Sequence, residues 1–398
     1  MSSQKNIKLL AWFNFFTDFK LYSAIAIIYF TNVTGSIALG MSIFAIANIA
    51  DALFEVPTGI LSDRVGRRKT IIFGALASVL YSICFAVGGS FWMLALGAVF
   101  QGLSIAFYSG NNDALLHDSL TESGKEKEFH TYLGKLSSLF QLALAIGAVL
   151  GSFLANTSFV LVMWLSVISQ IICFFISLQI IEPQIVMKKS TNIYEHMKEA
   201  IQLFKTNKKL RLVSIAGILG SSVGEATFQL SAAFFNTLWP LWAVGIAKMI
   251  SYLGAMMSYY FSGPLINKFK EIKLILIGNA YSRIVNSIAV LFPTQLSPVL
   301  CSSTSFFYGS LSVAKNSLLQ KEFTPHQRAT IASLNSLAES LFFAFFAFTL
   351  GALADRIGPA KALFISQLIS LIGTYLYWRV FQHERREPVP ANLRGLQG

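Results

Sequence analysis

The stretch Gly59-Ile-Leu-Ser-Asp-Arg-Val-Gly-Arg-Arg-Lys69 decides how this chain is organised. It places four cations, at Arg64 and at residues 67–69, directly between two long apolar segments. A short basic connection of this kind is typical of a membrane protein whose Lys and Arg residues stay on one side of the bilayer. The stretch therefore predicts a turn between two membrane-spanning helices.

Apolar segments of about 20 residues follow one another along the whole chain, each long enough to cross about 30 Å of hydrocarbon. We predict an all-α integral membrane protein with twelve transmembrane helices. The predicted spans are Ile7–Phe30, Ile37–Pro57, Thr70–Val87, Phe91–Ala114, Thr131–Ala155, Phe159–Ile181, Arg211–Ala233, Leu238–Ser262, Ile272–Phe292, Ser297–Leu319, Thr330–Leu353 and Ala360–Trp378.

Composition and charge agree with this prediction. The 398 residues are 54% hydrophobic and only 13% charged, whereas a soluble domain carries roughly 25% charged residues. The net charge of +12 comes mostly from the N-terminus, alternate loops and the C-terminal tail. This distribution indicates a multi-pass protein of the cell (inner) membrane with both termini cytoplasmic, and it argues against a nucleic-acid partner.

The longest connection divides the chain into two parts. We expect an N-terminal six-helix bundle at residues 1–182, a cytoplasmic linker at 183–210, a C-terminal six-helix bundle at 211–380 and a cytoplasmic tail at 381–398. Within the linker, Ile193, Met197, Ile201 and Phe204 recur at helical spacing among lysines. They predict either an amphipathic helix on the anionic membrane surface or a solvated linker helix.

The basic stretch has two weaker counterparts. Gly263-Pro-Leu-Ile-Asn-Lys-Phe-Lys270 stands at the equivalent place in the second half, and a Gly-x-Leu-x-Asp-Arg-x-Gly pattern occurs at Gly351–Gly358 on the opposite face. Two halves with weak internal symmetry are the layout of secondary transporters, in which the binding site lies between the halves.

Gly59–Lys69 resembles the hallmark loop of the major facilitator superfamily, G-x-L-x-D-R-x-G-R-[RK]-[RK], between that family's second and third helices. The matching residues are Gly59, Leu61, Asp63, Arg64, Gly66, Arg67, Arg68 and Lys69. Asp51–Thr58 and Ser109–Asp118 are similar to bacterial permeases of the same family. The resemblance implies two pseudo-symmetric six-helix bundles that alternate between inward-open and outward-open states.

The resemblance also implies that Asp63, Arg64, Arg67 and Arg68 help to gate the cytoplasmic ends of the two halves. Gly59 and Gly66 are expected to allow tight turns, because glycine adopts backbone angles that other residues avoid. Asp63 is expected to pair with Arg67 or to lie at a helix N-terminus, where a negative charge is favoured. The alternative is that the stretch serves only as a positive-inside anchor.

One departure concerns the direction of transport. Proton-driven exporters of this family often carry a glycine-rich motif with a proline on the fifth helix. Here the fifth span offers Gly147-Ala-Val-Leu-Gly151, and Ser152 stands where the proline is expected. The two glycines would then simply allow close helix packing.

Ionisable residues inside a span cost about 2.5–3.5 kcal/mol each on insertion scales, so they usually face a cavity, pair or titrate. Glu225, midway along the seventh span, is the first candidate for proton binding, and Gln229 lies one turn along on the same face. In the family, helices one, four, seven and ten line the central cavity. The alternative for Glu225 is a static hydrogen-bonded or ion-paired role.

Asp18, midway along the first span, is the second candidate for proton or cation binding, with Asn14 one turn before it. The alternative for Asp18 is a structural pair with a nearby lysine. Lys248, midway along the eighth span, could bind an anionic group or neutralise Glu225.

Four further ionisable residues are assigned to gating. Asp51 and Glu55 share one helix face close to the basic stretch, so we favour a gating or structural role over substrate contact. Asp113 and Lys315 fall at similar depth in the fourth and tenth spans. They could form a pair between the halves that breaks on opening.

Nothing in the sequence indicates covalent chemistry. There is no G-x-x-x-x-G-K-[ST] phosphate loop, every His lies at a predicted membrane edge, and the three Cys lack metal-ligand spacing. We therefore expect no catalytic residue, metal or cofactor. The prediction is a monomeric secondary transporter that exports an amphipathic small molecule by proton antiport. The alternatives are proton-coupled uptake of a nutrient or metabolite, and a non-transporting membrane receptor or scaffold.

Overall fold

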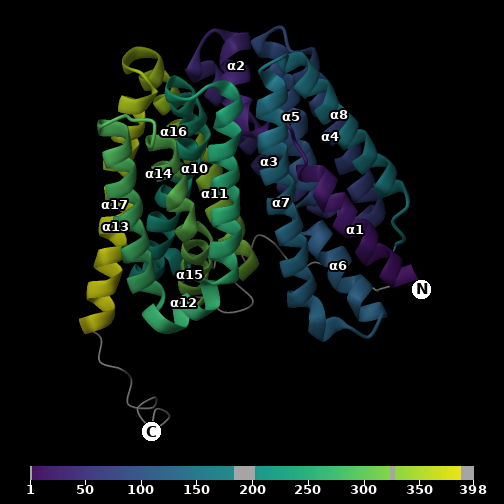
Figure 1. Ribbon diagram of the computed structural model, residues 1–398. Helices are drawn as coiled ribbons and strands as arrows, with labels where there is room; N and C mark the ends of the chain where they lie inside the picture. The colour runs from purple at the N-terminus through teal and green to yellow at the C-terminus, as the bar shows by residue number, and fades with distance from the viewer. Residues whose placement is uncertain (1, 183–201, 323–327, 387–398) are drawn as a thin grey trace.

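The computed structural model describes residues 2–182, 202–322 and 328–386, and within these ranges the regular structure is helical (Figure 1). In this part of the chain, nine helices are long and apolar enough to cross a membrane. Large apolar side chains such as Trp92, Phe153 and Phe175 are more than half exposed, as expected for surfaces that face lipid. The count of twelve spans in two bundles stays a prediction.

In the N-terminal half most helices are long, and successive long helices run antiparallel. They are α1 (Ser2–Asp18), η1 (Ser23–Ile25), α2 (Ala26–Thr34), α3 (Ile37–Val65), α4 (Arg67–Val87), α5 (Phe91–Tyr108), α6 (Asn111–Glu122), η2 (Glu126–Glu128), α7 (Phe129–Ala155) and α8 (Phe159–Leu178). Serine side chains at residues 36, 90 and 158 cap α3, α5 and α8 by accepting a backbone N–H three residues later.

The C-terminal half continues in the same way after the linker. Its elements are α10 (Lys208–Leu238), α11 (Leu241–Tyr260), α12 (Ser262–Phe269), α13 (Glu271–Leu291), α14 (Ser297–Ser303), η3 (Thr304–Phe307), α15 (Tyr308–Gln320), α16 (Arg328–Ile357) and α17 (Pro359–Arg386). The predicted linker helix falls mostly on 183–201, outside the described residues, and residues 202–206 are helical. The last residues of the predicted tail also lie outside the described ranges.

Three spans predicted as single helices are interrupted. The tenth contains η3, the fourth breaks at Gly110, and the first breaks between α1 and η1. At this last break, the carbonyl oxygens of Lys20 and Leu21 lie against α7 at Gly147 and Gly151. The close-packing interpretation of this glycine pair is therefore confirmed. Irregular backbone is tolerated at membrane depth where protein buries it, as α7 does here.

The two halves meet at one end of the molecule. Between them, α3 packs against α16 and α7 packs against α11. Figure 1 shows the halves together near α2 and separated near α6 and α12, each of which packs against helices of its own half. We call the end where α3 begins and α16 ends the closed end, and the end with α6 and α12 the open end.

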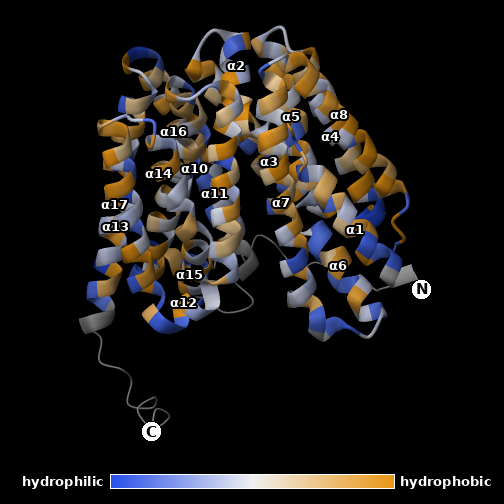
Figure 2. Cartoon of the chain, in the orientation of Figure 1, coloured by the Kyte–Doolittle hydropathy of each residue, from blue (hydrophilic) through white to orange (hydrophobic). Residues whose placement is uncertain are grey.

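The open end is where α1 begins and where α17 ends (Figure 1). Figure 2 shows hydrophobic residues along the middle of the outer helices and hydrophilic residues gathered toward the open end. The basic stretch Arg64–Lys69 also lies at this end, because α3 ends there and α4 begins there. Charge thus collects on the side where α1 begins and α17 ends.

Candidate functional site

At the closed end, one carboxylate joins the two halves. Asp355, near the end of α16, accepts hydrogen bonds from the backbone N–H of Ile37 at 2.7 Å and of Ala38 at 3.0 Å, and from the Ser36 hydroxyl at 2.6 Å. These are groups of the first turn of α3, whose N–H groups have no partner within their own helix. The negative charge also lies at the positive end of the α3 dipole. Asp355 therefore acts as a cap from the opposite half.

Small residues let the backbones approach at this end. A Cβ atom added at Gly351 of α16 would lie 2.6 Å from Ala38 Cα, and one added at Gly245 of α11 would meet the Ala148 carbonyl of α7 and lie 2.6 Å from Ser152 Oγ. Glycine is therefore required at both contacts for this packing. The closed end is a tight interface formed by α3 with α16 and by α7 with α11.

At the open end, the basic stretch is more helical than predicted. α3 continues to Val65, so Gly59 lies inside a helix and the predicted turn at Gly59 is wrong. A Cβ added at Gly59 would have open space around it. The turn at Gly66 is confirmed, with φ of 94°, a value that favours glycine.

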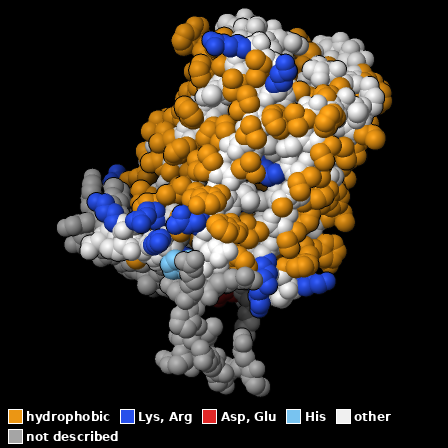
Figure 3. Space-filling view, turned by 90° about the vertical axis from the view of Figure 1, so that its left-hand side faces the viewer, with side chains coloured by type: hydrophobic (Ala, Val, Ile, Leu, Met, Phe, Trp, Pro, Cys, Tyr) orange, Lys and Arg blue, Asp and Glu red, His pale blue; other side chains and the backbone are white. Residues whose placement is uncertain are grey.

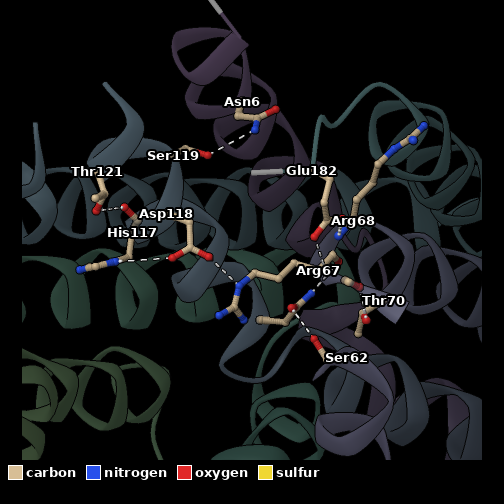
Figure 4. Close-up of polar contacts among 12 residues, drawn as sticks. Asn6, Ser62, Arg67, Arg68, Thr70, His117, Asp118, Ser119, Thr121 and Glu182 are labelled. Atoms are coloured by element: carbon tan, nitrogen blue, oxygen red, sulfur yellow. Dashed lines mark hydrogen bonds and ion pairs between the residues drawn. The ribbon is translucent and has the colours of Figure 1, made fainter. Parts of the chain in front are cut away.

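The partners of Arg67 differ from those predicted (Figure 4). Its Nε atom lies 2.7 Å from Asp118 Oδ2, and its backbone N–H donates to Glu182 Oε1 at 2.8 Å. Glu182 Oε2 accepts the N–H of Arg68 at 2.8 Å, so Glu182 takes the position at the α4 N-terminus. The predicted pairing of Asp63 with Arg67, or its placement at a helix N-terminus, is therefore wrong in this conformation.

The cluster is completed within the N-terminal half. Ser62 donates to Asn111 Oδ1 at 3.0 Å, and Asn111 Nδ2 donates to the Arg67 carbonyl at 3.0 Å. A cavity of about 160 Å³ beside these residues is lined by Asp63 and Arg67, among others of the same half. The side chains of Asp63, Arg64 and Arg68 are exposed.

Sequence reasoning missed two members of this cluster. Asp118 lies within a stretch already similar to bacterial permeases, and Glu182 marks the predicted boundary of the first half. An acidic residue that follows the last span of a half, close to a basic turn, is the signal that could have identified Glu182 as a helix cap.

Asp18 and Lys20 form an ion pair at the break in the first span, with 3.6 Å between Lys20 Nζ and Asp18 Oδ1. This is the structural pairing that the sequence left open for Asp18. Asn14 lies one turn earlier on α1. The pair stands where α1 ends, and a discontinuous helix at this depth is a common position for ion or substrate sites in transporters.

Glu225 and Gln229 share one face of α10, as predicted. Gln229 Nε2 donates to Glu225 Oε1 at 2.7 Å, and the Glu225 side chain is exposed although it lies in the middle of the helix. An exposed carboxylate midway along a span faces either lipid or a water-filled space, and only the second is favourable. The Glu225 carboxylate is therefore accessible at the surface of α10.

The Lys248 ammonium is bound by a carbonyl and a hydroxyl group of α10 and not by a carboxylate. Its side chain is only 2% exposed, its Nζ atom donates to the Phe228 carbonyl at 2.6 Å and to Ser231 Oγ at 3.0 Å, and it lies 3.6 Å from the centre of the Phe228 ring. The ammonium lies beyond ion-pair distance from Glu225, but the two charges still interact, so neutralisation of Glu225 by Lys248 stays a prediction. The cation–π contact and the two hydrogen bonds offset part of its desolvation.

The remaining predicted gating residues lie on three different helices, and only Asp51 and Glu55 are neighbours. Asp51 and Glu55 are one turn apart on α3, Asp113 is in the first turn of α6, and Lys315 is on α15, where its Nζ atom faces α10 at Gly220. Asp113 and Lys315 form no ion pair in this conformation. Within the described ranges, no group of His, Cys, Asp and Glu is placed to hold a metal ion.

The family model of the Major Facilitator Superfamily matches residues 9–342 of this chain. The chain belongs to the major facilitator superfamily. It is accordingly a multi-pass membrane protein of a family whose members are transporters. The predicted family is confirmed by the match across most of the chain.

Individual relatives are more distant. The chain is 26% identical over 267 residues to the quinolone resistance protein NorA of Staphylococcus aureus, covering 64% of each chain. It is 23% identical to the inner membrane transport protein YajR of Escherichia coli, covering 89% of this chain and 78% of YajR. An uncharacterized transporter of Buchnera aphidicola is matched over 34% of its length. The chain thus spans less than two thirds of the NorA and Buchnera proteins.

A crystal structure of a mutant of the nucleoside transporter NupG has a similar fold. The TM-score is 0.83 at 12% sequence identity, and the similarity covers 96% of this chain and 100% of that one. At this identity, the similarity shows the fold alone.

Proposed function

We propose that this chain is a twelve-helix secondary active transporter that works by alternating access between two six-helix halves. The proposal rests on two similar sequence patterns, of which only one contacts the opposite half. Asp355 of Gly351–Gly358 binds the other half at the closed end, whereas Asp63 of Gly59–Lys69 is exposed at the open end. We infer that the two aspartates engage in alternate states.

The orientation follows from charge. The open end carries Arg64–Lys69 and both described chain ends, and positive charge is retained on the cytoplasmic side. We therefore assign the open end to the cytoplasm, both termini to the cytoplasmic side and the protein to the cell inner membrane. The described conformation is then inward-open.

For the outward-open state, the halves would close at the cytoplasmic end and separate at the closed end. The hydrogen bonds from Ser36, Ile37 and Ala38 to Asp355 would break, and the exposed side chains of Asp63 and Arg64 would face the C-terminal half. Each end thus stabilises one state. The Arg67–Asp118 pair lies within one half, so we propose that it holds the shape of the stretch in both states.

Proton coupling is assigned to two carboxylates. Glu225 is exposed midway along α10, and its contact with Gln229 is a hydrogen bond that either protonation state could keep after a rotation of the amide. Asp18 is the second site, at the break in the first span, where Lys20 competes with a proton for the carboxylate. Lys248 is proposed to position Phe228 and the middle of α10 for substrate contact.

For the cargo, we propose export of a small amphipathic compound by proton antiport. The aromatic residues near Glu225 support an apolar partner, and Phe228 stacks edge-on with Tyr252 at 5.9 Å. Similarity to the quinolone resistance protein NorA supports the same direction. Proton-coupled uptake of a nutrient is the second candidate, because the nucleoside transporter NupG has a similar fold, and the fold is therefore compatible with a polar cargo.

The test uses purified protein in liposomes that contain a pH-sensitive dye. Amphipathic cations, zwitterions, organic acids and nucleosides are added as separate pools to wild type, to Glu225→Gln and to Glu128→Gln. Glu128 is an exposed acid outside the spans, so its variant makes the same chemical change away from the site. We expect substrate-dependent proton flux in wild type and Glu128→Gln, and a loss of roughly 100-fold in Glu225→Gln, as for removal of a proton-transfer group. Equal flux in all three proteins would contradict the role of Glu225.

A further inference from the structure

A groove opens on the surface of the C-terminal half at the open end. It lies between the first turns of α10 and the last turns of α17, and its volume is about 490 Å³. It is lined by Lys208, Leu212, Tyr375, Trp378, Arg379, Gln382 and His383. No predicted gating or transport residue belongs to this set.

The charge of the groove is positive. Lys208 and Arg379 are exposed, neither forms an ion pair within the described ranges, and no described carboxylate lines the groove. Glu322, on the neighbouring segment, is already bound by Lys209 at 2.9 Å. Asn207 caps α10, so the positive end of that 31-residue helix lies beside Lys208. The charge of the groove therefore favours an anion.

The groove also lies at the boundary between apolar and polar surface. Tyr375 and Trp378 stack with ring centroids 5.9 Å apart and are 52% and 46% exposed. Leu371 and Ile372, one turn deeper, are 49% and 53% exposed. Figure 3 shows this face of the molecule, with basic side chains gathered at its lower end beneath a broad apolar surface. Aromatic residues of this kind mark the level of lipid headgroups.

We propose that the groove between α10 and α17 binds the phosphate headgroup of an anionic phospholipid. Lys208 and Arg379 would hold the phosphate, and the aromatic pair would contact the glycerol region. The acyl chains would run along α17 over Leu371 and Ile372. Basic pockets at the membrane surface are recognised sites for anionic headgroups. This site goes beyond the proposed transport function and does not depend on it.

The test is native mass spectrometry of the purified full chain titrated with phosphatidylglycerol, and with phosphatidylcholine as the zwitterionic comparison. The site variant is Lys208→Ala with Arg379→Ala. The control is Lys268→Ala with Lys273→Ala, which removes two exposed cations from the same end of the same half. A second site variant, Arg379→Gln alone, removes the charge and keeps a shorter polar side chain at the surface.

We expect phosphatidylglycerol affinity to fall roughly fivefold per cation removed, and on the order of 25-fold in the double variant, as for loss of about 1 kcal/mol per basic residue. The control should keep wild-type affinity, and phosphatidylcholine should bind equally weakly to all variants. Equal losses in the site and control variants would overturn the proposal, because binding would then depend on diffuse charge. Displacement of phosphatidylglycerol by millimolar inorganic phosphate would overturn the lipid assignment in favour of a free anion.

Discussion

Two copies of one sequence pattern lie at opposite ends of this molecule, and they are used differently. In Gly351–Gly358, Asp355 caps α3 of the other half. Gly351, one turn before Asp355, lets the backbone of α3 approach closely. In Gly59–Lys69, Asp63 is exposed and a Cβ at Gly59 would meet nothing within 4 Å. The comparison shows one pattern that joins the two halves and one that does not, which is the difference that the proposed alternation between two states requires.

The comparison also distinguishes contacts that stabilise one half from contacts that join the two halves. Arg67 and Glu182 make their contacts inside the N-terminal half, through Asp118 and the start of α4. Asp355 makes its contacts between the halves. Changes in the first group should lower stability in every state, whereas changes in the second should shift the balance between states.

The largest effect is expected from Gly351→Ala. Its new methyl group would lie 2.6 Å from Ala38 Cα, so the closed end would have to separate. Overpacking of this kind costs about 1–3 kcal/mol, which shifts the balance between states by roughly 5- to 150-fold and should lower substrate flux in liposomes accordingly. Gly217→Ala is the control, because its Cβ would lie an ordinary 3.7 Å from the Tyr377 hydroxyl. Equal flux in the two variants would show that the close approach at Gly351 is not required.

A smaller effect is expected from Asp355→Asn. The neutral amide keeps the size of the side chain but weakens three hydrogen bonds to α3, in a setting partly open to solvent. We expect a loss of about 1–2 kcal/mol and therefore a shift of roughly tenfold toward separation of the closed end. The rate of thiol labelling at a cysteine introduced at Ile37 should rise by that factor. An unchanged rate would mean that Asp355 does not hold the halves together.

The smallest effect, and the opposite one, is expected from Asp63→Asn. Asp63 makes no contact with the other half in the described conformation, so its loss should leave this state intact and destabilise the alternative one. The same labelling at residue 37 should slow by a few-fold, as expected for a partly exposed charge. Faster labelling would break the comparison, because both aspartates would then favour the same state.

Much of this account was predictable from the sequence. The positions of nine spans in the described part of the chain, the family and the turn at Gly66 follow from hydropathy and a local pattern. The contact of Glu225 with Gln229 follows from helical spacing alone. Such features depend on residues close together in the chain, whose geometry a helix fixes.

The contacts that span the fold were not predictable in the same way. Which carboxylate caps α3 or α4 depends on tertiary packing, so Asp355 and Glu182 were not assigned as caps. The break after Asp18 depends on the approach of α7 at Gly147 and Gly151. Gly59 was placed in a turn because its residue type allows one, but the continuing helix of α3 uses no such freedom.

The most direct test of alternate engagement measures two distances in one protein. Spin labels at residues 92 and 292 report on the closed end, and labels at residues 128 and 268 report on the open end, all at exposed positions in a variant whose three cysteines are replaced. Pulsed dipolar spectroscopy then compares wild type with Asp355→Asn. The account predicts that the variant populates a longer distance at the closed end together with a shorter one at the open end. Distances that stay fixed, or that lengthen at both ends together, would contradict it.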